Sequence, residues 1–277
     1  MNVRRPADPS AFLTATRSLL LEDEARHNLL LGIAGTLKDH PEVYSEHRLW
    51  VLEEDGLVVG AALQTPPHNL VIARPLSEDA LVALAQTVDD VDVPGVTGAI
   101  PEADVFATAW ESRTRTTRHQ RMAQRIYKLT EVRPPVDIPG RPREATAADR
   151  ELLVTWARAF AEEATGAGTP GHANPEQIVD SRLAHGAGAF ALWEDGEVVS
   201  MAGWGGQTPN GVRVGPGYEP VCDSVDKGID SWRKQKASRA RAQQPGCGSS
   251  WNEAGYAARA ETRKLRCRSS ELRSRRQ

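Results

Sequence analysis

The chain has 277 residues, of which 40% are hydrophobic and 26% charged, and its formal net charge is −3. This length allows one large or two small domains. No apolar run approaches the roughly 20 residues that span a bilayer. The N-terminal residues lead into polar sequence and lack the apolar core of a signal peptide. We therefore expect a globular, cytoplasmic protein with no membrane partner.

Cysteines and histidines give no pattern of a metal or disulfide site. The three cysteines, Cys222, Cys247 and Cys267, are widely spaced and form no C-x-x-C pair. The seven histidines show no spacing typical of metal ligands. Free thiols and solvated or structural histidines are the simplest interpretation, and we expect no metal.

The charge is divided unevenly along the chain. Residues 227–277 carry fourteen Lys/Arg and four Asp/Glu, a net charge of +10, whereas the remainder carries −13. No helical or strand period persists in this basic tail, so we predict that it is disordered. Nucleic acid is expected as a partner only through this tail, by non-specific phosphate contacts. A shifted reading frame would explain its composition equally well.

In the first half, apolar residues recur at helical spacing between residues 12 and 37, which predicts helices there. Asp55-Gly56 between two apolar runs predicts a hairpin, and a third apolar run follows at residues 70–72. Further along we predict a helix from about Ser77, a strand region at 93–100, a helix from Pro101 and a strand at 121–130.

The proline-rich residues 132–142 read as a stiff linker. After it, Leu152, Leu153, Trp156 and Phe160 line one face of a predicted helix, with Asp149 as the candidate N-cap. Residues 166–171 predict a mobile loop. A second helix is expected from the cap residue Asn174 to Gly186.

The second half repeats the first. Residues 52–61 recur as 192–201, both with a central Asp-Gly, and Gln64-Thr65-Pro66 recurs as Gln207-Thr208-Pro209. A third run follows each copy, at 70–72 and at 212–214, and helical sequence precedes each copy. This repeat predicts two tandem related domains.

The ordered set of helices, Asp-Gly hairpin, third strand and a late Gly217-Tyr218-Glu219-Pro220-Val221 resembles N-acetyltransferases of the GNAT superfamily. Tandem members with a degenerate first domain are the most similar, and residues 24–32, 127–129 and 152–156 add to the resemblance, which covers about residues 1–226. It implies an α/β fold of two GNAT-like domains, with mixed, mainly antiparallel sheets flanked by helices. The expected boundaries are 1–131 for the first domain, 132–142 for the linker, 143–226 for a partial second domain and 227–277 for the tail.

The resemblance also implies acetyl-CoA as cosubstrate and a small-molecule or peptide primary amine as acceptor. Val212, Arg213, Val214 and Gly215 match the strand whose backbone pairs with the pantetheine arm. Trp156 and Phe160, with the loop at 166–171, match the region that covers the acceptor, although a packed core face explains both aromatic residues as well. No catalytic residue is assigned.

The pyrophosphate loop of that family has no counterpart between Val214 and Gly217, and from average element lengths roughly 40–50 residues are missing there. Residues 182–188 resemble the loop but precede a predicted strand, so a helix cap is the plainer interpretation. Residues 243–248 fit the spacing but follow the closing segment and contain a proline, which lacks an N–H. The second domain is therefore expected to be incomplete, and a non-catalytic interaction module or a truncated enzyme remnant is the alternative to an active enzyme.

Overall fold

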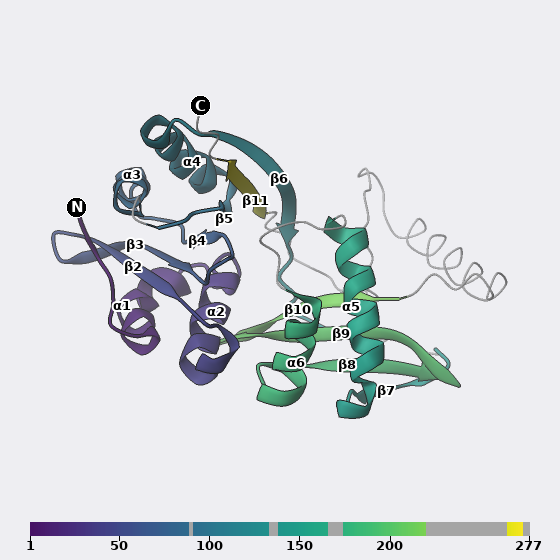
Figure 1. Ribbon diagram of the computed structural model, residues 1–277. Coiled ribbons are helices and arrows are strands. Elements are labelled where there is room, and N and C mark those ends of the chain that lie inside the picture. Colours follow the sequence, from purple (N-terminus) through teal and green to yellow (C-terminus); the bar gives the residue numbers. More distant parts are fainter. Residues whose placement is uncertain (89–90, 133–137, 166–173, 220–264, 274–277) are drawn as a thin grey trace, which may run out of the picture.

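The computed structural model describes residues 1–88, 91–132, 138–165, 174–219 and 265–273 (Figure 1). Two β-sheets, each with its own helices, make up these residues. We call β1 to β6 with their helices the first unit, and β7 to β10 with theirs the second unit.

The first unit alternates helices and strands around a mixed sheet. Its elements are β1 (Asn2–Arg4), α1 (Pro9–Leu21), α2 (Asn28–Asp39), β2 (Arg48–Glu54), β3 (Leu57–Gln64), β4 (Leu70–Ile72), α3 (Glu78–Thr87), β5 (Gly95–Ala99), α4 (Ile100–Thr114) and β6 (Thr117–Ile126). The strand order is β1-β2-β3-β4-β5-β11-β6, where β11 is Leu265–Arg273. Only the β4–β5 pair is parallel, so the prediction of a mixed, mainly antiparallel sheet is confirmed.

Side chains alternate between two cores on the faces of this sheet. Leu49, Val51 and Leu63 pack under α1 and α2. Trp50 and Leu52, from the same strand β2, pack under α3 and α4 with Phe106. Because successive strand residues point to opposite faces, one apolar strand supports both helix layers.

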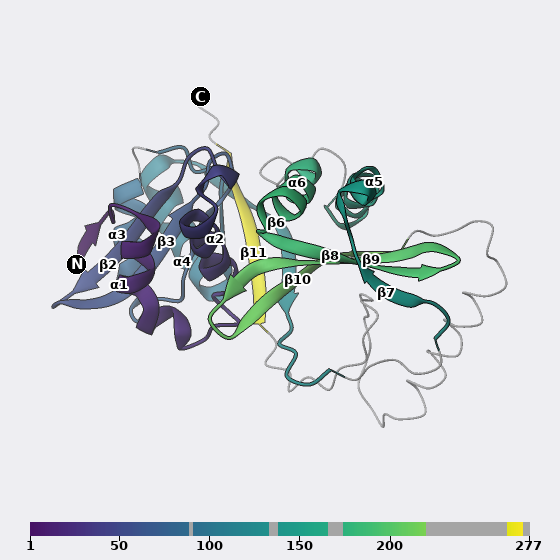
Figure 2. The ribbon, with the colours of Figure 1, turned by 90° about the horizontal axis from the view of Figure 1, so that it is seen from below.

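The second unit repeats the first four strands of that plan. Its elements are β7 (Arg141–Glu144), α5 (Arg150–Thr165), α6 (Pro175–His185), β8 (Gly188–Asp195), β9 (Glu197–Thr208) and β10 (Gly211–Tyr218). The order β10-β9-β8-β7 is antiparallel throughout and matches β4-β3-β2-β1. Figure 2 shows α5 and α6 on one side of these strands, where Leu153, Phe190 and Leu192 form a third core.

Both Asp-Gly turns form the predicted hairpins. Asp55 and Gly56 have φ of 50° and 80°, which places both in the left-handed region that the commonest two-residue hairpin turn requires. In the second copy only Gly196 separates β8 from β9, with φ of 75°. The shared sequence therefore produces the same strand pairing around slightly different turns.

The helix starts of the second unit are capped by side chains near the predicted positions. Asn174 caps α6 through its side chain, which accepts from the N–H of Glu176, and Gly186 ends the helix with φ of 69°. Helix α5 begins at Arg150, directly after the predicted N-cap Asp149, and it continues a short 3₁₀ turn (Ala147–Asp149) that Thr146 caps. Asp149 completes a capping box by accepting from the backbone of Thr146.

The basic tail is described only at residues 265–273. They form β11, which pairs antiparallel with both β5 and β6. Because β11 is hydrogen-bonded to a neighbouring strand on each side, its pairing in the sheet needs no alternation of apolar and polar residues in its sequence. The other tail residues, with Cys222, Cys247 and the phosphate-like segment 243–248, lie outside the described residues, and the nucleic-acid prediction for the tail stays untested.

The two units meet where α2 contacts β9 and β10. A Cβ built on Gly32 of α2 would lie 2.7 Å from the Cα of Gly206, so the two backbones are nearly in contact. Beside them, the backbone N–H and the side-chain amide of Asn210 donate to the Glu24 carboxylate at 2.8 and 2.9 Å. Burial acts to raise the pKa of Glu24, but these bonds and one from Thr208 outweigh it, so the net pKa is lowered.

Candidate functional site

Strand β10 holds the four residues predicted to bind the cosubstrate, Val212, Arg213, Val214 and Gly215. It is the edge strand of its sheet and pairs only with β9 among the described residues. Val212 is 47% exposed and Val214 68% exposed. On the side away from β9 no described strand pairs with β10, as pairing with an extended amide chain requires, although the Gly215 carbonyl accepts a hydrogen bond from Arg182.

The register of β10 shifts within this segment. Val214 pairs with Trp204, but the next regular pair is Gly217 with Ala202, so a bulge separates Val214 from Gly217. A bulge bends a strand and leaves backbone groups unpaired. Tyr218, which the sequence places in a late closing segment, instead lies on β10 itself, opposite Met201.

Of the two residues predicted to cover the acceptor, Trp156 is 8% exposed and belongs to the core of the second unit. Its ring lies 6.1 Å from that of Tyr218, tilted by 53°. Phe160 lies one turn further along α5 and is half-buried. The structure thus places Trp156 in the packed core, while Phe160 lies closer to the surface.

Tyr218 and Glu163 form a polar pair that sequence reasoning did not identify. The Tyr218 hydroxyl donates to Glu163 Oε1 at 3.0 Å, bridging β10 and α5. Burial and then this hydrogen bond raise the pKa of Tyr218, so its hydroxyl stays protonated at neutral pH. The two residues are 55 positions apart, and no sequence pattern links residues at that distance, so the pair could not be predicted.

In the first unit, the loop after β4 occupies the place equivalent to the end of β10, and its backbone donors are engaged internally. The N–H groups of Ala73 and Leu76 donate to Ala61 and Val59. The N–H of Arg74 donates to His27 Nε2 at 3.0 Å, and Pro75 has no N–H. This loop therefore has no free run of amides to cradle a phosphate.

An ion pair lies between the loop that joins α1 to α2 and the first turn of α4. Arg26 Nη2 donates to Glu102 Oε1 at 2.5 Å, and Glu102 is only 8% exposed. Close by, Ile72 packs so tightly on Gly98 that a Cβ there would lie 2.6 Å from the isoleucine side chain. The end of the parallel β4–β5 pair is thus occupied by side chains of the chain itself.

Segment 182–188, with its phosphate-loop spacing, is the end of a helix. The N–H of Ala187 donates to the Ser181 carbonyl, and Gly186 has left-handed geometry. Strand β8 begins two residues later, at Gly188. The prediction of a helix cap before a strand is confirmed.

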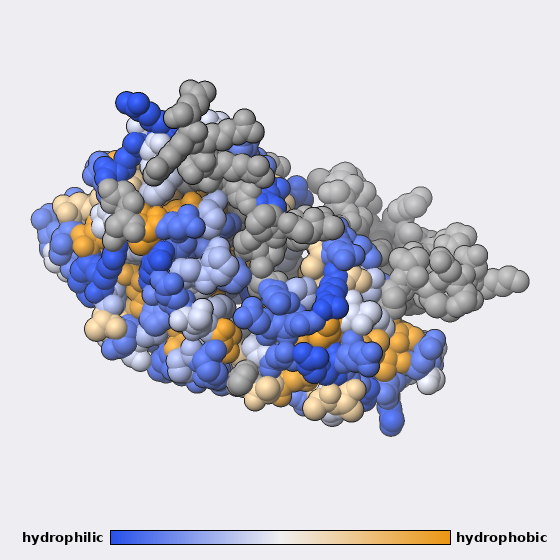
Figure 3. Space-filling model, viewed as in Figure 1, coloured by the Kyte–Doolittle hydropathy of each residue, from blue (hydrophilic) through white to orange (hydrophobic). Residues whose placement is uncertain are grey.

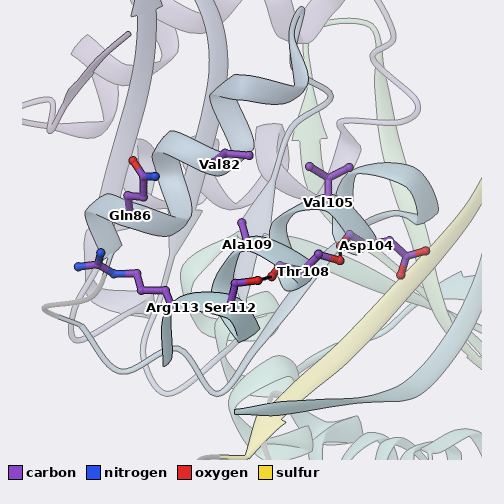
Figure 4. A pocket seen from close by; sticks show the side chains of 8 residues that line it. All are labelled: Val82, Gln86, Asp104, Val105, Thr108, Ala109, Ser112 and Arg113. Carbon is purple, nitrogen blue, oxygen red and sulfur yellow. Dashed lines mark hydrogen bonds between the residues drawn. The ribbon is translucent and has the colours of Figure 1, made fainter. Parts of the chain in front are cut away.

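A groove on the first unit runs between α3 and α4 (Figure 4). Val82, Val105 and Ala109 supply its apolar lining, and Gln86, Asp104, Thr108, Ser112 and Arg113 its polar part. Figure 3 shows that apolar side chains on the viewed side of the molecule lie in small separate groups among hydrophilic ones. The groove has no cluster of acids, bases or nucleophiles typical of a catalytic site.

Within the described ranges, no group of three or more His, Cys, Asp or Glu could hold a metal ion. Among the same residues, none of the helices has the length and apolar character needed to cross a membrane.

A scan against models of protein families and a search of curated proteins both found no match. Among solved structures, the chain is similar to a tandem GNAT protein from the clavulanic acid biosynthesis pathway, at 10% identity and a TM-score of 0.47, covering 98% of each chain. It is also similar to a GNAT-family acetyltransferase from Colwellia psychrerythraea, at 11% identity and a TM-score of 0.42, covering 98% of this chain and 100% of the other. A GCN5-related N-acetyltransferase from Kribbella flavida has 13% identity and a TM-score of 0.44, covering 88% and 98%. At these identities and TM-scores the similarity assigns no activity.

Proposed function

We propose that the second unit binds the pantetheine arm of acetyl-CoA along the free edge of β10 and transfers the acetyl group to a primary amine. The observation that carries this proposal is the geometry of β10: a strand paired on one side, with a bulge between Val214 and Gly217, beside α5. Before the Gly215 carbonyl, which accepts from Arg182, its edge offers alternating N–H and C=O groups, which match the amides of pantetheine.

The transfer needs one proton removed and one supplied. The amine nitrogen attacks the thioester carbon, the C–N bond forms and the C–S bond breaks. In this proposal Glu163 takes the proton from nitrogen, Tyr218 gives its hydroxyl proton to the departing thiolate, and the proton on Glu163 then restores Tyr218. The hydrogen bond from the Tyr218 hydroxyl to Glu163 supports these roles, because it provides the path by which the proton on Glu163 returns to Tyr218.

The internal hydrogen bonds of the first unit argue against the same role for it. Ala73, Arg74 and Leu76 already use their N–H groups, and the Arg26–Glu102 pair fills the end of the β4–β5 pair. Binding a pyrophosphate there would break at least three internal hydrogen bonds, each of which contributes about 1 kcal/mol to stability. We assign the first unit the role of a scaffold that supports the β9–β10 hairpin.

The test compares two acetyl donors by isothermal titration on the full chain. We expect sub-millimolar binding of acetyl-CoA and binding of S-acetyl-pantetheine within about tenfold of it, because among the described residues no phosphate cradle follows β10. Millimolar or absent binding of both donors would refute the enzyme proposal. A much tighter acetyl-CoA complex would instead locate a phosphate site elsewhere in the chain.

A matched pair of variants tests the proton-transfer roles. Tyr218→Phe keeps the ring contact with Trp156 but removes the hydroxyl, so donor binding should persist while the acetylation rate falls by roughly 10²-fold or more. Thr155→Val, an exposed change on the same helix as Trp156, serves as the control and should leave the rate within about twofold. Equal rates in the wild-type chain and the Tyr218 variant would remove Tyr218 from the mechanism.

The second candidate is a non-catalytic interaction module. It is favoured by the first unit, which has two complete cores and no free phosphate-binding loop. In that case neither acetyl donor would bind, and no amine would be acetylated.

A further inference from the structure

A second feature of the β10 region is a pair of arginines, Arg182 and Arg213, that have no acidic partners among the residues that the structure describes. Arg182 lies in the C-terminal half of α6, and its Cζ is 4.9 Å from the centre of the Phe190 ring on β8. Its Nη2 donates to the carbonyl of Gly215, inside the β10 bulge, at 2.8 Å. Its Nη1 is buried and has no hydrogen-bond partner among the described residues.

The sequence leaves room for this guanidinium. Arg182 lies against Gly203 and Gly205 of β9, and a Cβ on Gly203 would collide with its Nη1. Small residues at both positions therefore allow the side chain to lie flat on the strand. A buried guanidinium N–H without an acceptor costs free energy comparable with a lost hydrogen bond, so an acceptor at this point would be stabilising.

Arg213 brings a second positive charge to the same face of the sheet. It lies opposite Gly205 on β9, and a Cβ on Gly205 would be 3.4 Å from Arg182 Nε, so the side chains of both arginines lie on the face toward which the Gly205 Cα–Cβ direction points. In agreement with this placement, burial first and then the charge of Arg213 lower the pKa of Arg182 to about 10, which still leaves Arg182 charged at neutral pH. Within residues 1–88, 91–132, 138–165 and 174–219, none of the ion pairs involves Arg182 or Arg213. Two neighbouring cations without a counter-ion favour an anionic ligand.

The first unit also contacts this region, because α2 lies against β10. The half-buried Tyr44, which follows the short 3₁₀ turn after α2, feels the charge of Arg213. A Cβ on Gly186 would lie 3.9 Å from His40, so the end of α6 faces the same segment of the first unit. The arginine pair therefore lies where the two units meet, next to the bulge of β10.

We propose that Arg182 and Arg213 form an oxyanion-binding site at this junction, and that the acceptor amine carries a carboxylate or phosphate group that they hold. This proposal rests on the proposed function and specifies its acceptor class. Bound in this way, the anionic group anchors the acceptor beside the bulge, where the acetyl group of a donor on β10 would lie.

The experiment measures binding of amines to the full chain without acetyl donor, so that it does not depend on catalysis. Each anionic probe has a neutral partner: 4-aminobutyrate with 4-aminobutanamide, and phosphoethanolamine with ethanolamine. We expect at least one anionic probe to bind tenfold or more tightly than its partner. The pair that shows the preference identifies carboxylate or phosphate as the recognised group.

Two variants test whether Arg182 and Arg213 cause the preference for anionic probes. Arg213→Gln should reduce it at least fivefold, and Arg182→Gln should abolish it. Arg17→Gln removes the same charge from an exposed position on α1 and should leave the preference unchanged. Equal binding of anionic and neutral probes, or a preference that survives both changes, would overturn the site. If the chain prefers anionic probes but does not bind acetyl-CoA, the proposed function is refuted and the anion-binding site is supported.

Discussion

His27 shows how one buried side chain fixes three segments of the first unit. It is 4% exposed, and its ring bonds to the carbonyl of Leu20 through Nδ1 at 2.9 Å and to the N–H of Arg74 through Nε2. An amide N–H can only donate, so Nε2 must accept and Nδ1 must carry the proton. The folded chain thus requires the neutral imidazole.

This requirement predicts a pH dependence of stability. Burial lowers the pKa of His27 below 6.5, so below pH 6.5 the unfolded chain binds more protons than the folded one, and the free energy of unfolding falls with pH. Between pH 7.5 and 5.5 we expect His27 to account for a loss of about 1 kcal/mol, measured by urea denaturation. His27→Gln should be less stable at pH 7.5 but lose less on acidification.

The exposed His47 provides the control, since His47→Gln should keep the wild-type pH dependence. A pH dependence that is identical in the wild-type chain and in His27→Gln would contradict this role of His27.

At the level of elements, the sequence predicted most helices and strands because their signals are local. Apolar spacing located α1 to α4, the two Asp-Gly pairs located the hairpins, and Asn174 and Gly186 delimited α6. At the start of α5, Thr146 and Asp149 share one capping box around the 3₁₀ turn that precedes the helix. Both residue types cap helices, and only the direction of their hydrogen bonds distinguishes them.

The packing of α2 on β9 predicts opposite effects for two glycines of one helix. In Gly32→Ala the new methyl group would meet the Gly206 backbone at 2.7 and 2.9 Å, whereas in Gly35→Ala it would be 3.6 Å from the Gln207 carbonyl. Gly32→Ala should destabilise the chain by about 1–3 kcal/mol through this clash. Gly35→Ala should be neutral or stabilise it by up to about 1 kcal/mol, because alanine favours helix.

Chemical denaturation of the full chain, followed by tryptophan fluorescence, measures both changes. The two variants share the helix and the substitution, so they differ only in distance from the second unit. Equal stabilities of Gly32→Ala and Gly35→Ala would show that α2 and β9 do not pack this closely in solution.

For the whole molecule, the tandem plan assigns different roles to two similar units. The first unit continues from β4 into α3, β5 and α4, and its loop after β4 is closed by internal hydrogen bonds. The second unit ends, within the described residues, at the open edge of β10. Donor binding should therefore involve only one of the two equivalent strands.

Hydrogen–deuterium exchange with saturating acetyl-CoA tests this division. We expect peptides that contain residues 211–218 to exchange several-fold more slowly with the donor present. Peptides that contain residues 73–77 should not change, since the Ala73, Arg74 and Leu76 amides are already bonded. Protection at 73–77 without protection at 211–218 would place donor binding in the first unit.

The sequence by itself determined the repeated helix–hairpin–strand plan, the short connection between Val214 and Gly217, and the charge division, because each is a local pattern. The tertiary structure decided which backbone groups remain free. It showed that His27 engages the Arg74 amide across 47 residues, that Gly217 and Tyr218 continue β10, and that Arg182 reaches the Gly215 carbonyl. These contacts join residues far apart in the chain, so they depend on how the elements pack and not on any spacing in the sequence.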